Sequence, residues 1–402
     1  MNISPFHMAA IAVVAIDGLQ VAGTTPPFIT TNDYILSGIV DAQGQHWIIK
    51  YPRTDHAGAL LEAEGSATAA LLEQLRLGHL SFDVIHPEGW AVYEGRRAMV
   101  YPAPLGKSIN WAEFTSVHAR ELGRSLARLH SLEPEIFTSA GLPSYDPHAV
   151  HDRLFTELDD AADATSVPAI LRRRWLNMLD DSDLWIFAQV PLHGDIADEN
   201  LLWSEGSLRT ILGFGEAYVG DPAVDIAPIM ASLDVHAFSE FFDSYQHNVC
   251  TPPDEHLLER ATFMSEFALV QWLMHGILTH DRSVCKEANI MLKKLAADIE
   301  ADPETAPGPA WHIESPVLSN YSSANEAYDD PENTEYSYAL SPDNDDYASD
   351  DDDLSLPSSP LSNHLSPVST SRTTPETALT ADLALTADLA YTADMAWSAD
   401  EA

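Results

Sequence analysis

The chain of 402 residues is poor in basic residues and in cysteine, and it lacks long apolar runs. Its 20 lysines and arginines face 62 aspartates and glutamates, which gives a formal net charge of −42. We expect no nucleic-acid partner, because the phosphate backbone selects basic surfaces. Two cysteines, Cys250 and Cys285, imply no disulfide framework and favour a reducing compartment.

The beginning of the chain lacks the marks of a membrane or signal segment. The apolar stretch Met8–Ile16 is too short to span a bilayer. The first basic residue is Lys50, so the stretch has no basic flank. We therefore expect a cytoplasmic protein with no membrane partner.

The composition changes sharply near residue 301. Residues 301–402 hold 21 acidic residues and one basic residue, Arg372, whereas residues 1–300 hold 41 acidic and 19 basic residues. The segment 301–402 is rich in Pro, Ser, Asn, Asp and Thr and ends in a six-residue repeat from Ala378. Such a segment cannot bury enough apolar surface to offset its ordering entropy, so we expect a disordered acidic tail.

The first hundred residues alternate like a small sheet with few helices. Period-two patterns predict strands, and apolar residues at helical spacing predict helices. Asp41-Ala42-Gln43-Gly44 is typical of a hairpin turn, and Pro26 and Pro27 predict a loop. The expected strands are Gln20–Gly23, Asp33–Asp41, His46–Lys50, Trp90–Tyr93 and Ala98–Tyr101, and the expected helices are Met8–Asp17 and Leu60–Leu77.

The region from 102 to 300 is mainly helical by the same criteria, with a strand–loop–strand insert near its centre. The pattern predicts an α+β, two-lobe fold: a β-rich lobe at 1–101, a helical lobe at 102–300 and the tail at 301–402. The expected helices are Ala112–His130, Ala169–Asp180, Ala223–Leu233, Ala237–Asn248, Glu255–His280 and Val284–Glu300.

The stretch His193-Gly194-Asp195, followed by Asn200, carries the clearest chemistry. A loop aspartate can orient an alcohol and accept its proton, and an amide oxygen five residues later can bind Mg²⁺ between phosphates. We interpret His193 as a structural residue that bonds the loop backbone. Asp198 and Glu199 are expected to be exposed loop charges, although Asp198 could face a cationic substrate.

The next predicted strand, Arg209–Phe214, is where such a site needs a second metal ligand. The sequence there is Ile211-Leu212-Gly213-Phe214, and glycine offers no carboxylate. Glu216 is a less favoured substitute because it falls in the turn after the strand. Further on, Asp221 is expected to cap a helix that begins at Pro222, and Asp225 to brace the catalytic loop.

The sheet offers a nucleotide-binding pair. Lys50 ends a predicted strand, and Glu64 lies 14 residues on in a predicted helix, where it can pair with the ammonium group. Alone, Lys50 is more simply a surface lysine, and Glu62 is a second possible partner. The segment that includes Met99 and Tyr101 closes the sheet and is expected to meet the nucleotide base.

Together these residues resemble the aminoglycoside and macrolide phosphotransferase superfamily, and macrolide 2′-phosphotransferases most of all. The H-G-D-x-x-x-x-N and G-D-P-x-x-D patterns carry the resemblance, which spans about residues 20–300. It implies a protein-kinase-like fold with Asp195 as catalytic residue, Lys50 and Glu64 as the nucleotide-clamping pair and Asn200 as a metal ligand. It also implies Mg²⁺, GTP or ATP as phosphate donor, and a cationic, hydroxylated small-molecule acceptor.

Two hypotheses follow. The first is a small-molecule kinase that phosphorylates a hydroxyl of a macrolide-like antibiotic or a related metabolite. The second is a catalytically impaired, pseudokinase-like protein that binds nucleotide or ligand, because the resembling enzymes have aspartate where this chain has Gly213.

Overall fold

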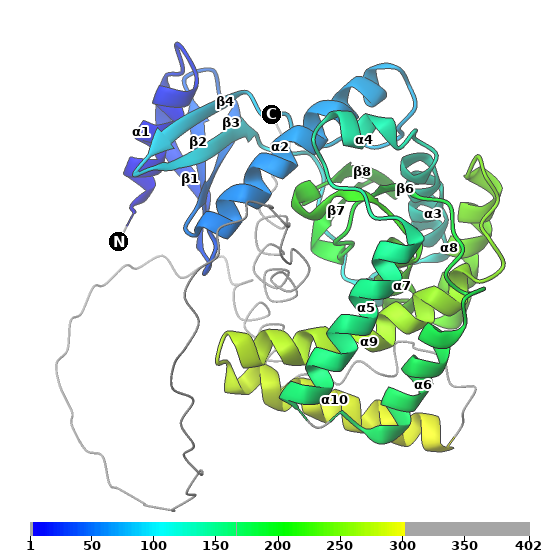
Figure 1. Cartoon of the computed structure of the whole chain (residues 1–402). Coiled ribbons are helices and arrows are strands. Elements are labelled where there is room, and N and C mark those ends of the chain that lie inside the picture. Colours follow the sequence, from blue (N-terminus) through cyan, green and yellow to red (C-terminus); the bar gives the residue numbers. More distant parts are fainter. Residues whose placement is uncertain (1–2, 166, 302–402) are drawn as a thin grey trace, which may run out of the picture. The chain divides into compact units, whose positions relative to one another are not determined.

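The computed structural model describes residues 3–165 and 167–301, all of which belong to one compact unit (Figure 1). A five-stranded antiparallel sheet with the order β1-β2-β3-β5-β4 comes first, and a mainly helical part follows. This is the α+β, kinase-like plan expected from the sequence. The predicted disorder and the repeat of residues 302–402 lie outside the described residues.

The sheet is built around the predicted hairpin. Strands β2 (Tyr34–Asp41) and β3 (His46–Pro52) pair in antiparallel register. The carboxylate of Asp41 accepts hydrogen bonds from the backbone N–H groups of Gln43 and Gln45, and Gly44 supplies the left-handed backbone of the turn, with φ of 84°. Strand β3 also pairs with β5 (Arg96–Pro102), which pairs with β4 (Gly89–Tyr93).

Side chains of successive residues point to opposite faces of the sheet, and each face has its own core. One face, which includes Ile49 and Val100, packs on helix α1 (Pro5–Ala15). The other, which includes Ile48 and Met99, packs on helix α2 (Asp55–Arg76). Lys50 is two residues from Ile48 and therefore shares the face that α2 covers, the helix that carries Glu64.

The prediction of a loop at Pro26 and Pro27 is wrong. Strand β1 runs through both prolines, from Val21 to Thr30, with a register shift between Thr25 and Phe28. Strand β1 lies at the edge of the sheet, where a residue without an N–H group is tolerated and a bulge absorbs the irregularity.

Six helices of the second part, α10 (Arg282–Ala301) among them, match their predicted ranges within four residues at each end, and two described helices were not predicted. The missed helices are α4 (Glu135–Ser139) and α5 (Pro147–Ala164). In α5 the start signals, Asp146 as N-cap and Pro147, were present, but acidic residues interrupt the apolar pattern. The five other matching helices are α3 (Ser116–His130), α6 (Ala169–Asp180), α7 (Ala223–Ser232), α8 (Val235–Asn248) and α9 (Leu257–Leu278).

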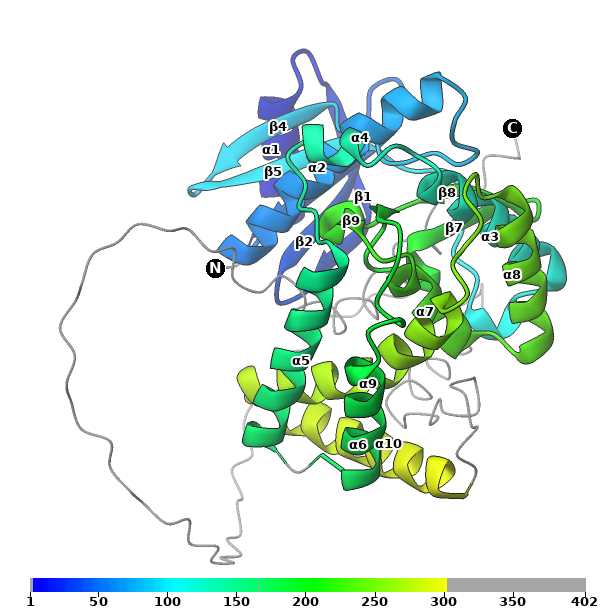
Figure 2. The same cartoon turned by 45° about the vertical axis from the view of Figure 1, so that its right-hand side comes forward.

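The last described helix, α10 (Arg282–Ala301), packs along α9, as both views show (Figures 1 and 2). Helix α3 packs along α8, and α7 packs against α9. In the part of the chain that the structure describes, no helix is both long and apolar enough to cross a bilayer.

Short strands carry the central loop. Strand β6 (Val190–Leu192) pairs with β9 (Tyr218–Gly220), and β7 (Leu201–Ser204) pairs with β8 (Ser207–Ile211). The sequence His193–Asn200 therefore connects two separate hairpin-like pairs. The strand predicted to reach Phe214 ends at Ile211, because Gly213 has a left-handed backbone and residues Phe214–Glu216 form a 3₁₀ turn.

Candidate active site

Lys50 and Glu64 form a buried ion pair. The ammonium nitrogen of Lys50 lies 3.0 Å from Oε2 of Glu64 and 4.4 Å from the ring centroid of Tyr34. Both charged residues are buried. The alternative partner, Glu62, instead binds Arg97 at the surface. Burying two charges costs solvation energy, which only a close ion pair offsets. The attraction to Glu64 therefore fixes the direction of the Lys50 side chain.

The loop His193–Asp195 is hydrogen-bonded to the side chain of Asp225, in the first turn of α7. The two carboxylate oxygens of Asp225 accept hydrogen bonds from the backbone N–H groups of His193 and Gly194, both at 2.8 Å. The ring of His130 donates a third hydrogen bond to Asp225 through Nε2, and its Nδ1 atom forms a hydrogen bond with the hydroxyl group of Tyr245. The role predicted for Asp225, bracing the loop, is therefore present in the structure.

The ionisation of Asp225 follows from these donors. Burial raises the pKa of its carboxyl group, but the hydrogen bond and charge of His130 and the loop N–H groups outweigh burial and hold the pKa below its usual value. The loop is thus fastened to a carboxylate that stays charged at neutral pH.

His193 is a structural residue, as predicted. Its Nε2–H group donates to the carbonyl of Leu212 at 2.6 Å, and its Nδ1 atom accepts from the backbone N–H of Asp195 at 3.1 Å. These partners require a neutral ring with the proton on Nε2. Burial lowers the pKa of His193, which favours the same neutral form.

Asn200 lies against Gly213. The amide nitrogen of Asn200 donates to the carbonyl of Asp195 at 3.1 Å, and its backbone carbonyl accepts from the N–H of Leu212 at 2.9 Å. Its Oδ1 atom is buried and has no hydrogen-bond partner among the described residues. A Cβ atom added at Gly213 would lie 2.9 Å from this Oδ1 atom. Position 213 and the free oxygen of Asn200 therefore face each other.

The segment after Gly213 brings the loop close to α2. A Cβ atom added at Gly215 would lie 3.3 Å from the carbonyl oxygen of Leu60, one helical turn before Glu64. The charge of Glu64 also contributes to the pKa of His193. The Lys50–Glu64 pair and the His193–Asp195 loop therefore belong to one electrostatic neighbourhood.

Asp221 has a larger role than the helix cap predicted for it. It does accept a hydrogen bond from the N–H of Ala223 at 3.0 Å, but its carboxylate also binds Arg260 on α9 at 2.7 Å. Arg260 further binds Asp254 and the carbonyl of Leu184. Helix α7 starts at Ala223, so Pro222 is the residue before the helix. Arg260 was missed, although a lone arginine on an apolar helix face is a signal of a buried ion pair.

The prediction for Glu199 is wrong, because this residue is buried rather than exposed. A 3₁₀ turn, Asp198–Asn200, directs it inward. Burial and the neighbouring Asp198 raise the pKa of Glu199 to about 9, so it is protonated at neutral pH. Asp198 is half-buried and accepts a hydrogen bond from the N–H of Trp111 at 3.1 Å.

Met99 and Tyr101 lie in the central part of the sheet. Both are buried, and their residues pair with Lys50 and Ile48 of β3. Their contact with a nucleotide base stays a prediction. Glu216 lies beside the loop His193–Asp195, where a Cβ atom added at Gly194 would be 3.3 Å from the Cβ atom of Glu216.

A sheet that carries a lysine–glutamate pair, followed by a helical part with a braced H-G-D loop, defines a kinase-like phosphotransferase. The comparisons with known proteins give the family. The model of the phosphotransferase enzyme family matches residues 40–261. The chain therefore belongs to this family, and it is a small-molecule phosphotransferase that acts on hydroxyl groups.

Solved structures of the same fold include antibiotic-modifying enzymes. Macrolide 2′-phosphotransferase MphH from Brachybacterium faecium superposes with a TM-score of 0.59 at 22% identity, over 70% of this chain and 96% of that chain. The GDP and kanamycin complex of APH(2")-IIia has a TM-score of 0.59 at 16% identity, over 73% and 99% of the two chains. These identities show a shared fold.

A curated relative, protein YcbJ of Bacillus subtilis, is 22% identical over 238 residues. The match covers 57% of this chain and 78% of that protein, which is described as uncharacterized.

Proposed function

We propose that this phosphotransferase transfers the γ-phosphate of GTP or ATP to a hydroxyl of a macrolide-like antibiotic or a related metabolite. The observation that carries the proposal is the loop His193–Asp195, whose two N–H groups are fixed by Asp225. The fixed loop presents Asp195, which orients the acceptor hydroxyl and takes its proton.

The donor is proposed to be a purine nucleotide held from the sheet. Lys50, aimed by Glu64, contacts the α- and β-phosphates, and the backbone near Met99 and Tyr101 meets the base. Structures of the same fold that contain GDP or ATP support this choice. GTP and ATP are equally consistent with the residues named.

The donor set fits a magnesium ion only in part. The buried, unpartnered Oδ1 atom of Asn200 is a suitable oxygen ligand. Gly213, which faces it, supplies no carboxylate. A bound Mg²⁺ would neutralise charge on the donor phosphates. This chain therefore supplies one protein ligand for the Mg²⁺ ion, Asn200, where the resemblance implies two.

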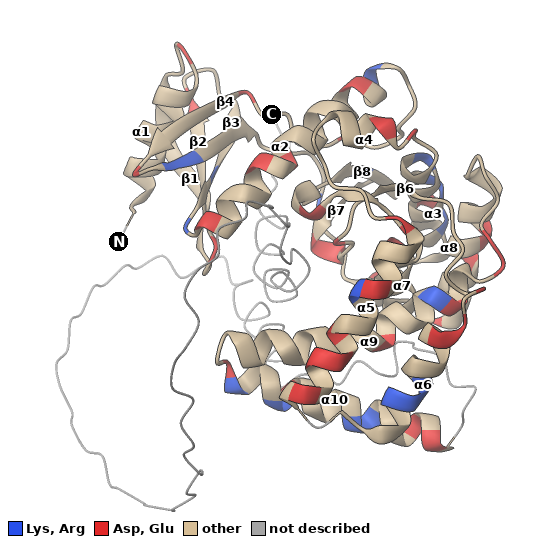
Figure 3. Ribbon diagram, viewed as in Figure 1, with Lys and Arg blue, Asp and Glu red and all other residues tan. Residues whose placement is uncertain are grey.

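The acceptor is proposed to be cationic as well as hydroxylated. Residues 1–300 carry 41 acidic against 19 basic residues, and the positions of acidic residues are spread over both parts of the described ribbon (Figure 3). A surface of this sign raises the local concentration of a cation such as an amino sugar. Complexes of the same fold with gentamicin and with streptomycin support an amino-sugar acceptor.

The test is phosphate transfer by the purified chain with MgCl₂, GTP or ATP, and separate panels of macrolides and aminoglycosides. We expect a phosphorylated product from at least one panel and no product from Asp195→Ala. Asp183→Ala, which removes an exposed carboxylate elsewhere, is the matched control and should behave like the parent. Transfer that survives in Asp195→Ala would remove Asp195 from the proposed role.

Gly213 favours a second candidate function, a nucleotide- or ligand-binding protein without turnover. The two candidates separate in one experiment, because nucleotide binding measured by calorimetry would persist while no panel member is phosphorylated.

A further inference from the structure

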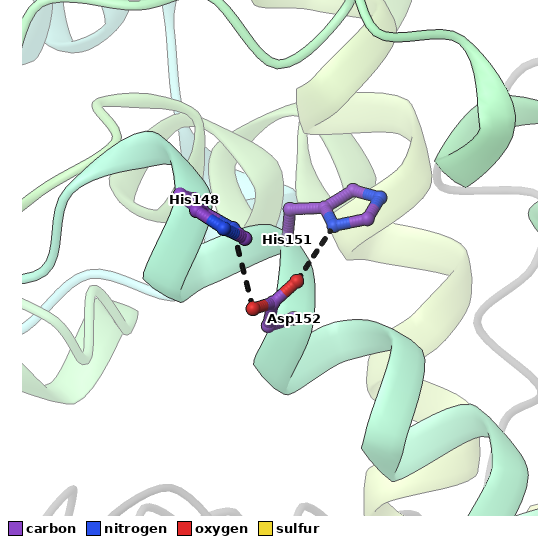
Figure 4. A group of neighbouring side chains, drawn as sticks. All are labelled: His148, His151 and Asp152. Atoms are coloured by element: carbon purple, nitrogen blue, oxygen red, sulfur yellow. Dashed lines mark hydrogen bonds and ion pairs between the residues drawn. The ribbon is translucent and has the colours of Figure 1, made fainter.

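Helix α5 carries a cluster of two histidines and an aspartate that includes none of the residues proposed for phosphate transfer. His148 lies three residues before His151 and four residues before Asp152, spacings that place its side chain beside each of them on the helix (Figure 4). Their potential ligand atoms all lie within 4.8 Å of one another. Each histidine Nδ1 atom is 3.2 Å from a different oxygen of Asp152.

The tautomer of His151 can be assigned from its second hydrogen bond. Its Nε2 atom lies 2.9 Å from the carbonyl oxygen of Leu179, at the end of α6. A carbonyl oxygen only accepts hydrogen bonds, so Nε2 carries a proton. In the neutral ring, Nδ1 then has a lone pair, and this lone pair faces a carboxylate oxygen of Asp152. Two lone pairs at 3.2 Å repel each other unless a proton or a metal cation lies between them.

The hydrogen bond from Nε2 of His151 to the carbonyl of Leu179 is of the kind that orients metal-binding histidines. A ligating imidazole usually donates its other N–H group to a carbonyl or carboxylate, which fixes the ring and its tautomer. The ring of His151 also packs edge-on against Trp185, with 5.9 Å between centroids. The side chains of His148 and Asp152 are 82% and 61% exposed, so an ion can reach them from solvent.

The geometry points to a binding site for a divalent transition metal, with Zn²⁺ as the natural occupant, at the start of α5. The ligands are Nδ1 of His148, Nδ1 of His151 and the carboxylate of Asp152, and water fills the fourth position. Two imidazole nitrogens disfavour Mg²⁺ and Ca²⁺, which take oxygen ligands. The site is therefore chemically distinct from a magnesium site at Asn200, and it does not depend on the proposed function.

Metal binding here would tighten the contact between α5 and the end of α6. All ligands come from α5, and His151 is tied to Leu179 through its other ring nitrogen. Holding His151 in one orientation preserves that hydrogen bond, so the bound state is expected to unfold at a higher temperature than the metal-free state.

The test is titration of the full chain, freed of metal by a chelator, with ZnCl₂ in the absence of nucleotide. We expect His148→Ala and Asp152→Asn each to bind one equivalent of Zn²⁺ fewer than the parent, or to bind that equivalent at least tenfold more weakly. His247→Ala, which removes an exposed histidine of α8, is the matched control and should bind as the parent does. Circular dichroism should show equal folding of all four proteins.

A second readout follows the folded state. Zn²⁺ should raise the melting temperature of the parent and of His247→Ala, and it should do so less in the two site variants. Equal stoichiometry and affinity in the parent and both site variants would overturn the inference, and so would a parent whose melting temperature does not respond to Zn²⁺.

Discussion

Replacing Gly213 by aspartate directly tests whether the proposed active site lacks a second metal ligand at this position. The Cβ atom of the new residue would lie 2.9 Å from the side-chain amide of Asn200, so the carboxylate is added beside the buried Oδ1 atom that has no partner. This distance is shorter than a normal contact, so the side chain of Asn200 must shift to admit the new Cβ atom. After that shift, the two side chains would form the oxygen pair that holds a magnesium ion in kinase-like sites. We expect Gly213→Asp to transfer phosphate faster than the parent.

The magnitude depends on two opposing effects. Gly213 has φ of 80°, a conformation that costs an L-residue about 1–2 kcal/mol, although aspartate is among the residues that adopt it most readily. Against this, a group that stabilises transition-state charge in a buried site contributes about 3 kcal/mol. A gain of about 2.7 kcal/mol in the barrier corresponds to about a hundredfold increase in kcat. The backbone cost affects stability, whereas the electrostatic gain affects the rate.

The matched control is Gly213→Asn, which adds a side chain of the same shape and the same backbone cost without the charge. Initial rates are measured with MgCl₂ and the preferred nucleotide for the parent and both variants, beside their melting temperatures. The reasoning predicts a rate gain for aspartate alone and similar small losses of stability for both. A parent that turns over rapidly, with Gly213→Asp no faster than Gly213→Asn, would refute it.

Three further perturbations have defined outcomes. Arg260→Met leaves the buried carboxylate of Asp221 and the half-buried carboxylate of Asp254 without their cation and should destabilise the fold by about 3–5 kcal/mol, whereas Arg97→Met removes an exposed pair and should cost less than about 1 kcal/mol in denaturant unfolding. Asp225→Asn should lower kcat, because an amide cannot accept both loop N–H groups. The folded pKa of Asp225 lies below its ordinary value of 3.8, so its stabilisation is present above pH 3.8 and is lost as pH falls through the folded pKa, and acid titration should show this loss in the parent and not in the variant. Glu64→Gln should raise KM for nucleotide, while Glu62→Gln, which alters only a surface pair, should leave KM unchanged in the same assay.

The parts of the site that lie close together in the sequence were predictable. The spacing of Asp195 and Asn200 is set by one short loop, and the strand–loop–strand pattern around it is local. The Lys50–Glu64 pair could also be predicted from the sequence, because strand alternation and the following helix place the two residues on facing surfaces. Element boundaries in the helical part followed from apolar periodicity for the same reason.

Contacts that depend on tertiary packing were not predictable. Arg260 reaches Asp221 across 39 positions in the sequence, and nothing local to either residue identifies the partner. Glu199 reads as a loop charge, yet a single 3₁₀ turn buries it beside Asp198. The path of β1 through two prolines depends on its position at the sheet edge, which is a property of the assembled sheet rather than of the segment.

The departure at position 213 is confined to one carboxylate, and this bears on how the chain works. The brace from Asp225, the tautomer of His193 and the buried oxygen of Asn200 are all in place around Gly213. A site that had lost its function through general decay would be expected to lose these supporting contacts as well, since each holds a buried polar group at a cost in desolvation. Because only the carboxylate at position 213 is missing, the expected effect falls on the rate of phosphate transfer, while the fold and the nucleotide binding proposed for Lys50 are expected to stay intact. Nucleotide affinity equal in the parent and Gly213→Asn, beside a rate that responds to Gly213→Asp, is the pattern that this argument requires.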